Sequence, residues 1–199
     1  VPDGLKFDYL DVSFLGDSDT AGVGPGRSAG FEALLSRRFC WTGNVSGQRG
    51  TGYTNAGAGD RDDYASRIGA ITATSPGLVF IQGGLNDLDS PNLVTAASES
   101  MALLRAEAGD AFLVVIGPAP APSIDIAELR GANDVIRDAA LRNGAHFVDL
   151  LSYSWAYDPN SYVTSTVFLS KSGHKLLADQ VATDLKNIDA SRFSTCDPV

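Results

Sequence analysis

The chain has 199 residues, of which 44% are hydrophobic and 20% are charged, and its formal net charge is -9. This size and composition fit one globular domain with a sizeable core. The excess of acidic residues argues against nucleic acid or an anionic membrane as the main partner, and no apolar run approaches the roughly 20 residues of a membrane span. The chain opens on Val-Pro-Asp and its only methionine is Met101, so we expect a processed or excised start.

Apolar strand-like runs alternate with helical patterns along the whole chain. The predicted strands are Tyr9–Leu15, Tyr53–Ala56, Leu78–Gln82, Phe112–Ile116 and His146–Leu150. The predicted helices are Ser28–Phe39, Asp62–Thr72, Pro91–Ala108, Ile126–Asn143 and Lys171–Ile188. Residues 41–52 and 151–169 are predicted loops, and the second of these is rich in aromatic residues. The alternation predicts a parallel sheet covered by helices on both faces, in one domain over residues 1–199.

Polar segments follow each of the first three predicted strands. Ser18 comes just after Gly16, where the first strand stops, Gly59 follows the second strand and Asn86 follows the third. Because the carboxyl ends of parallel strands meet at one edge of a sheet, we expect these residues to converge. A serine can attack a carbonyl carbon, and N–H groups can stabilise the oxyanion that forms. The pattern favours Ser18 as a nucleophile over a simple turn serine, with its own N–H, the N–H of Gly59 and the Asn86 amide as donors.

Three sequence blocks together resemble the SGNH (GDSL) family of serine ester hydrolases. The blocks are Gly16-Asp17-Ser18, the glycine of Asn55-Ala56-Gly57-Ala58-Gly59-Asp60, and Gly84-Leu85-Asn86-Asp87, in that order after the first three predicted strands. The resemblance covers essentially the whole chain. It implies a flavodoxin-like three-layer α/β/α sandwich with a five-stranded parallel sheet. It also implies that Ser18 is the nucleophile and that Gly59 and Asn86 complete the oxyanion hole.

The fourth block of the family differs in this chain. The family places an Asp and a His three residues apart just before the last helix, and with Gly173-His174 aligned these positions hold Ser165 and Phe168. Neither side chain can replace the missing one, because serine carries no charge to stabilise an imidazolium and phenylalanine cannot accept a proton. His174, at the start of the last helix, is a candidate base, and a packing or capping role is its alternative. His146 is expected at the opposite edge of the sheet as a structural or surface residue.

Other residues at this edge are candidate ligand contacts. Asp17, Trp155 and Tyr157 are possible substrate-binding residues, and the aromatic loop could line an acyl or sugar pocket or simply pack on itself. Asp17 and Asp19 have no third ligand spaced to join them in a metal site. We therefore expect neither a metal nor a cofactor.

The two cysteines of the chain, Cys40 and Cys196, follow the first and the last predicted helix. In a flavodoxin-like order these helices share one face of the sheet and end at the same edge, so a Cys40–Cys196 disulfide is geometrically sensible. A disulfide implies an oxidising compartment. We therefore expect an extracytoplasmic or secreted protein.

Two functional hypotheses remain. In the first, the chain is a carboxylic ester hydrolase that acts through Ser18, with His174 or a water molecule as an altered base. In the second, it is a catalytically impaired SGNH-like domain, by natural or engineered loss of the Asp/His pair, that binds an ester or a carbohydrate. Both hypotheses predict a small-molecule, lipid or carbohydrate ester as ligand, and we expect a monomer.

Overall fold

The computed structural model describes residues 11–196. Its centre is a five-stranded parallel sheet in the order β2-β1-β3-β4-β5. The strands are β1 (Asp11–Gly16), β2 (Thr42–Gly47), β3 (Leu78–Gln82), β4 (Phe112–Ile116) and β5 (His146–Val148). This is the flavodoxin-like strand order, so the predicted fold class is confirmed. The predicted first strand includes Tyr9 and Leu10, which lie outside the described residues.

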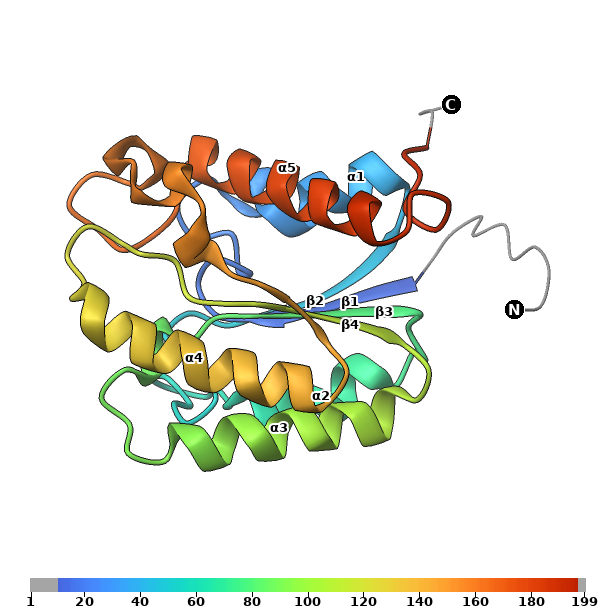
Figure 1. Ribbon diagram of the computed structural model, residues 1–199, viewed down its shortest axis with the longest axis horizontal. Helices are drawn as coiled ribbons and strands as arrows, with labels where there is room; N and C mark the ends of the chain where they lie inside the picture. The colour runs from blue at the N-terminus through green and yellow to red at the C-terminus, as the bar shows by residue number, and fades with distance from the viewer. Residues whose placement is uncertain (1–10, 197–199) are drawn as a thin grey trace.

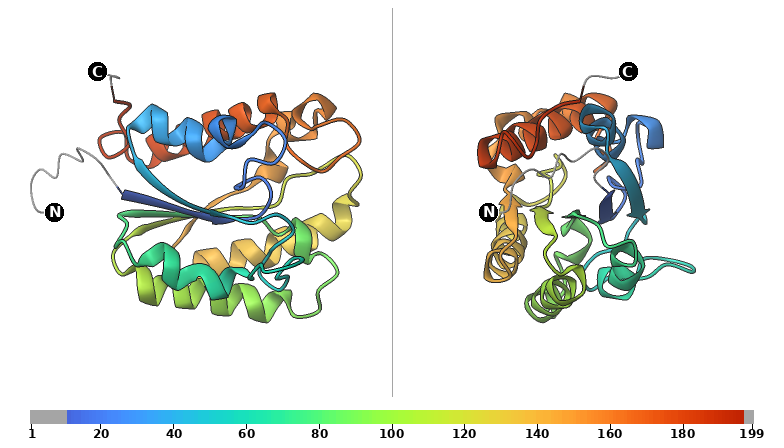
Figure 2. Two further views of the ribbon diagram at one scale, coloured as in Figure 1. Left: turned by 180° about the vertical axis from the view of Figure 1, so that it is seen from behind. Right: turned by 90° about the vertical axis from the view of Figure 1, so that its right-hand side faces the viewer.

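Helices cover both faces of the sheet and make the three layers of Figure 1. On one face lie α1 (Phe31–Phe39) and α5 (Lys171–Ile188). On the other face lie α2 (Tyr64–Thr72), α3 (Leu93–Ala108) and α4 (Ile126–Arg142). Figure 2 shows the two helical layers from behind and from the side. The short 3-10 helices are η1 (Arg27–Ala29), η2 (Leu85–Asp87), η3 (Leu150–Ser152), η4 (Ser154–Tyr157) and η5 (Pro159–Ser161).

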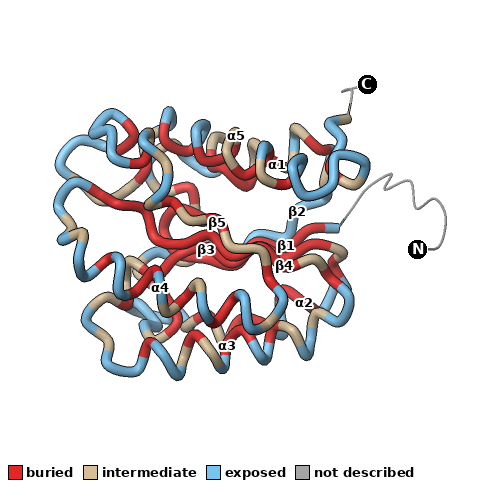
Figure 3. Tube along the Cα trace, viewed as in Figure 1, coloured by how far each residue is buried: buried red, intermediate tan, exposed pale blue. Residues whose placement is uncertain are grey.

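The side chains of β1, β3, β4 and β5 alternate between two apolar cores, one under each helical layer. Phe14 faces the core beneath α1 and α5, where its ring stacks on Phe80 at 4.8 Å between centroids. Leu15, the next residue, faces the core beneath α2, α3 and α4. The central strands are buried on both faces (Figure 3). Burial on both faces explains why these strands are continuous apolar runs in the sequence.

The second strand was predicted in the wrong place. The sequence predicted it at Tyr53–Ala56, whereas the structure forms β2 from Thr42–Gly47, inside a predicted loop. β2 is an edge strand whose side chains are exposed or half-buried, and it pairs in parallel with β1 alone. Its register therefore comes from backbone hydrogen bonds, which leave no apolar pattern in the sequence. Tyr53 is buried for another reason, because its ring packs edge-on against Tyr64 of α2 at 4.9 Å between centroids.

A disulfide joins Cys40 to Cys196, with a Cα–Cα distance of 5.9 Å. It links the end of α1 to the segment that follows α5, as the sequence predicted. A disulfide of this kind is compatible with an extracellular location. Among the helices of residues 11–196, none has the length and apolar character needed to cross a membrane.

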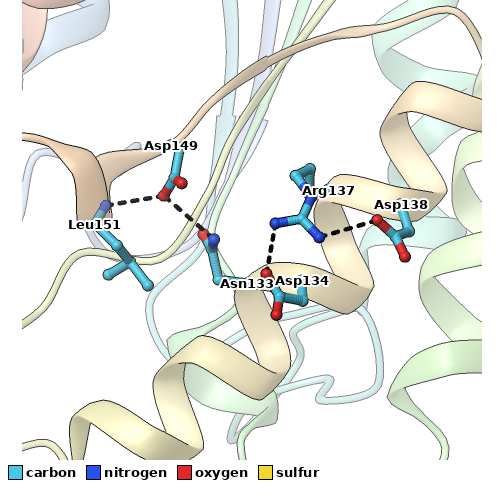
Figure 4. Close-up of polar contacts among 6 residues, drawn as sticks. All are labelled: Asn133, Asp134, Arg137, Asp138, Asp149 and Leu151. Carbon is cyan, nitrogen blue, oxygen red and sulfur yellow. Dashed lines mark hydrogen bonds and ion pairs between the residues drawn. The ribbon is translucent and has the colours of Figure 1, made fainter.

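The connection between β5 and α5 is tied to α4 at its start. The Nδ2 group of Asn133 in α4 donates to Asp149 Oδ1 at 3.2 Å, and the same oxygen accepts the Leu151 N–H at 3.0 Å (Figure 4). On the solvent side of α4, Arg137 pairs with Asp134 and Asp138. The long connection then runs through three short 3-10 helices to the start of α5, where the Ser170 hydroxyl accepts the Gly173 N–H.

Candidate active site

The turn after β1 holds Ser18 at the carboxyl edge of the sheet. Asp17 Oδ1 accepts the Asp19 N–H at 2.9 Å, and the Thr20 hydroxyl donates to Gln82 Oε1 on β3 at 2.8 Å. Gly16 is required here, because a Cβ at this position would overlap the Thr20 side chain. These contacts fix the backbone on both sides of Ser18, a residue that is 8% exposed. Neither the Ser18 hydroxyl nor its N–H makes a hydrogen bond to another described residue.

Asn86, which follows β3, lies beside this turn as predicted. Its Nδ2 group donates to the Thr51 carbonyl oxygen at 2.9 Å and lies 3.5 Å from Asp17 Oδ2. The longer contact is at the limit of a hydrogen bond. One N–H of the Asn86 amide is therefore well satisfied, and the other is only weakly engaged by Asp17.

The neighbouring Asp87 holds the β2–α2 loop against the same edge. Its two carboxylate oxygens accept the N–H of Tyr53 at 3.0 Å and the N–H of Thr54 at 2.8 Å, and the Thr54 hydroxyl adds a third bond at 2.8 Å. Asp87 is only 1% exposed. Its carboxylate therefore replaces the hydrogen bonds that this irregular backbone would otherwise lack.

The glycine that packs beside Asn86 and Asp87 is Gly52, whereas Gly59 lies elsewhere in the loop. A Cβ on Gly52 would overlap the Asp87 carboxylate, while nothing lies within 4 Å of a Cβ built on Gly59, which is exposed. This difference from the expected position follows from the misplaced strand, because β2 ends at Gly47 and the loop that meets Asn86 begins earlier than predicted. The Gly52 N–H donates to the Asn55 carbonyl oxygen at 2.8 Å.

Two buried carboxyl groups flank Ser18. Burial raises the pKa of Asp17 to about 7, and the charge of Asp87 adds to this rise. Hydrogen bonds from the Asp19 backbone and the Gln82 side chain lower the pKa and oppose it. Burial, together with the charge of Asp17, also raises the pKa of Asp19 well above its usual value. Asp19 Oδ1 accepts the Leu169 N–H at 3.3 Å. Asp17 is 3% exposed, so it offers a ligand little surface.

The structure does not bring His174 to Ser18. The ring is fully buried between α5 and α1, where Nδ1 accepts the Phe31 N–H at 3.1 Å and the two rings lie parallel at 6.2 Å between centroids. Burial lowers its pKa to about 4, despite the backbone of Val23, which raises it. Nε2 has no hydrogen-bond partner among the described residues. The packing role, the alternative in the sequence, is the one observed. His146 begins β5 at the opposite edge of the sheet, also as predicted.

The loop that precedes α5 reaches the Ser18 turn but brings no base to it. Ser165 is exposed in a left-handed conformation, with φ 60°. Phe168 is half-buried, and the Arg49 guanidinium lies over its ring at 4.8 Å from the centroid. The contact of Leu169 with Asp19 shows that the loop is docked at the site. Arg49 had no signal in the sequence, because an exposed arginine in a loop has no distinguishing pattern.

The candidate aromatic residues of the long connection pack close to their own segment. Trp155 is half-buried and packs on the core beneath α1 and α5. Tyr157 is exposed, and its hydroxyl donates to the Leu151 carbonyl oxygen at 3.0 Å. No hydrogen bond or ring contact joins either residue to the Ser18 turn within the described chain. These contacts agree with the packing alternative for both residues.

Known proteins share this sequence pattern and this fold. The model of the GDSL-like lipase/acylhydrolase family matches residues 14–176 of the chain. No curated protein sequence matches it. The solved structure of a lipase/acylhydrolase from Enterococcus faecalis is similar with a TM-score of 0.71 at 19% sequence identity, over 89% of this chain and 96% of that chain.

Two esterase structures are similar over most of the chain. A psychrotrophic esterase from Pseudoalteromonas sp. has a TM-score of 0.68 at 15% identity, over 89% of this chain and 97% of that chain. A family two carbohydrate esterase from Clostridium thermocellum, in complex with cellohexaose, has a TM-score of 0.68 at 18% identity, over 94% of this chain and 66% of that chain. At such identities the likeness shows the fold, and it agrees with the three-layer sandwich described above.

Proposed function

Because this chain belongs to the GDSL-like lipase/acylhydrolase family, we propose that it binds a carboxylic ester at Ser18 and turns the ester over slowly. One observation carries the second half of the proposal: the Ser18 hydroxyl has no hydrogen-bond acceptor among the described residues. The resemblance to SGNH hydrolases that the sequence blocks predicted is confirmed by the family match. The roles of individual residues are proposals that rest on the geometry of the edge.

Ser18 and Asn86 supply the donors of the proposed oxyanion hole. The Ser18 N–H has no hydrogen-bond partner among residues 11–196. The second N–H of the Asn86 amide makes only the long 3.5 Å contact with Asp17, which a ligand oxygen could replace. A carbonyl oxygen between these groups would gain two stronger hydrogen bonds. Gly52 is a third candidate, but its N–H donates to Asn55 and becomes available only if the loop opens that bond.

Attack by Ser18 Oγ on the ester carbon releases the hydroxyl proton, and this step needs a base. The chain has two histidines, His146 and His174, and neither contacts Ser18. The carboxyl oxygens of Asp17 and Asp19 accept backbone N–H groups and make no hydrogen bond with the Ser18 hydroxyl. The attack must therefore proceed with water as the proton acceptor, which makes it slow.

The test combines binding and turnover. Titration with ethyl butyrate, followed by NMR, should shift the amide signals of Ser18 and Asn86. Hydrolysis of p-nitrophenyl acetate by the unchanged chain should differ little from that of Ser18→Ala. The double variant Ser165→Asp/Phe168→His should show turnover that Ser18→Ala abolishes, because it restores both members of the acid–base pair.

A matched control places the same side chains one position earlier, as Thr164→Asp/Val167→His. This control should stay as slow as the unchanged chain, since its histidine lies outside the aligned position. Rapid, Ser18-dependent turnover by the unchanged chain would instead favour an active hydrolase with a different base. No shift at Ser18 or Asn86 with any acetate or butyrate ester would contradict ester binding itself.

A further inference from the structure

Arg67 of α2 is a buried arginine whose guanidinium lies at the ends of β1 and β2. The residue is 4% exposed, and it makes no ion pair with a carboxylate of residues 11–196. Its Nε, Nη1 and Nη2 atoms donate instead to backbone carbonyl oxygens and to hydroxyl oxygens. Because arginine is rarely buried without a charged partner, these neutral contacts need a reason in the structure.

The guanidinium ties together the ends of two neighbouring strands. Nη1 donates to the Ser46 carbonyl oxygen of β2 at 2.7 Å, and Nη2 donates to the Gly16 carbonyl oxygen of β1 at 3.2 Å. The Gly16 oxygen also accepts the Gln48 N–H at 3.1 Å. Arg67 therefore holds the backbone two residues before Ser18 against the end of β2.

The same guanidinium holds the loop on the donor side of the proposed ester site. Nη2 donates to the Thr51 hydroxyl oxygen at 2.9 Å, and this hydroxyl donates to the Gln48 carbonyl oxygen at 2.7 Å. The Thr51 carbonyl oxygen is the acceptor of the Asn86 amide at 2.9 Å, and Gly52 is the next residue. One side chain thus contacts both segments that carry or orient the proposed donors.

A lysine could not make this set of contacts. The guanidinium carries its N–H donors in a rigid plane on separate nitrogens, whereas a lysine carries all of its donors on one nitrogen. The charge of the guanidinium also acts on the Ser18 turn. Burial raises the pKa of Asp17, and the charge of Arg67 opposes this rise.

We propose that Arg67 is the positioning residue of the oxyanion hole. It fixes the Ser18 turn relative to residues 51–52, and it orients the Asn86 amide through the Thr51 carbonyl oxygen. Arg67 touches no atom of the ester, so it acts by holding the donors where the developing oxyanion needs them. This role rests on the proposed ester site, because it is exerted only through the donors of that site.

The main test separates turnover from binding in the Ser165→Asp/Phe168→His background. Arg67→Lys keeps the positive charge but loses the separate nitrogens. It should lower kcat for p-nitrophenyl acetate by about 10²-fold and change KM by about threefold or less, because misplaced donors weaken the oxyanion more than the neutral ester. Thr51→Val removes only the hydroxyl that accepts from Arg67, so kcat should fall less, by about tenfold.

Arg105→Lys is the matched control. Arg105 also donates to backbone carbonyl oxygens, but those of Gly109, Ala111 and Asn143, which lie just before β4 and β5 at the opposite edge of the sheet. The control should lower the urea midpoint and leave kcat unchanged. Equal kcat in Arg67→Lys and its background, or the same loss of kcat in Arg105→Lys, would overturn the positioning role.

A double-mutant cycle in the unchanged chain tests the link without an ester. Arg67→Lys and Asn86→Ala together should lower the urea midpoint by less than the sum of their separate effects, because both act on the backbone at Thr51. Arg105→Lys and Asn86→Ala should be additive. Additivity of the Arg67 and Asn86 changes would contradict the inference even if the ester binds. Coupling between them, without any Ser18-dependent turnover or ester binding, would support the inference and contradict the proposed function alone.

Discussion

The donor side and the base side of the Ser18 site differ in how firmly the fold holds them. On the donor side, the Asp87 carboxylate fixes the backbone of Tyr53 and Thr54, and Asn86 binds the Thr51 carbonyl oxygen. On the base side, the aligned positions are an exposed Ser165 and a phenylalanine that packs under Arg49. The segments on the donor side therefore take part in hydrogen bonds that also stabilise the fold. The two aligned base positions lie in the loop before α5, where Ser165 is exposed and Phe168 is half-buried, so their side chains can change at less cost to the fold.

The largest expected effect comes from repairing the base side. Ser165→Asp/Phe168→His should raise p-nitrophenyl acetate hydrolysis by about 10²–10⁴-fold, the usual contribution of a positioned general base. Phe168→His alone should give a small part of this gain and Ser165→Asp alone none, because the carboxylate acts only by orienting the imidazole. Steady-state rates of the two single variants and the double variant measure the coupling. Simple additivity of the two changes would show that the loop does not assemble a pair.

The next effect tests which glycine belongs to the donor side. Gly52→Ala should lower the free energy of unfolding by about 3 kcal/mol, because its Cβ overlaps the Asp87 carboxylate and breaks a buried network. The same change should abolish the shifts that ethyl butyrate causes at Asn86. Urea denaturation and the NMR titration report the two results.

Gly59→Ala is the matched control for this comparison. Gly59 has φ +75° but open space around its Cβ, so the change should cost only about 1 kcal/mol of backbone strain and leave ester binding intact. If Gly59→Ala removes ester binding and Gly52→Ala does not, Gly59 belongs to the oxyanion hole, as the sequence blocks predicted, and Gly52 does not.

Substitution of His174 tests whether this histidine has a structural or a catalytic role. His174→Ala should lower the free energy of unfolding by about 2–4 kcal/mol, because it leaves a cavity and an unpaired Phe31 N–H. In the Ser165→Asp/Phe168→His background it should leave the turnover number of the folded protein unchanged. His146→Ala, at a half-buried position, should cost less.

The loss of unfolding free energy caused by His174→Ala should depend on pH, because the pKa of His174 is shifted. Its folded pKa of about 4 lies below the usual value of 6.5. The stability from the neutral ring is therefore fully present above about 6.5 and is lost as the pH falls through about 4. Denaturation curves across this range should show that the effect of His174→Ala shrinks in acid. An effect of constant size would contradict burial of the neutral ring.

Sequence reasoning succeeded where one physical constraint acts on a whole segment. Leu78–Gln82 and Phe112–Ile116 are buried on both faces, so their apolar runs gave the strand bounds that the structure has. The Cys40–Cys196 disulfide followed from the order of the helices alone. The convergence of Ser18 and Asn86 likewise needs only a parallel sheet.

Sequence reasoning failed where tertiary contacts decide. β2 is held at the sheet edge by its backbone, so residues 42–47 carry no strand pattern. Misplacing β2 moved the loop register, so the sequence pointed to Gly59, whereas the structure places Gly52 beside Asp87. What distinguishes the two glycines is the Asp87 carboxylate beside Gly52, a contact across 35 positions of the chain. The same holds for His174, whose partner Phe31 lies on another helix.

The last stability effect concerns Glu32, whose pKa is raised by burial, whereas the pKa of His174 is lowered. The folded Glu32 pKa of about 7 is raised from 4.5 by burial, so the stability it contributes is present below about 4.5 and is lost as the pH rises through about 7. Glu32→Gln removes the ionisable group and should raise the free energy of unfolding at pH 8 by about 2 kcal/mol, with little change at low pH. Asp17 shifts in the same direction, so part of the pH slope should survive in the variant. Urea denaturation from acid to pH 8, beside Glu128→Gln as the exposed control, measures the difference. A variant that loses stability at pH 8 would mean that the ionised carboxylate has a partner in the fold.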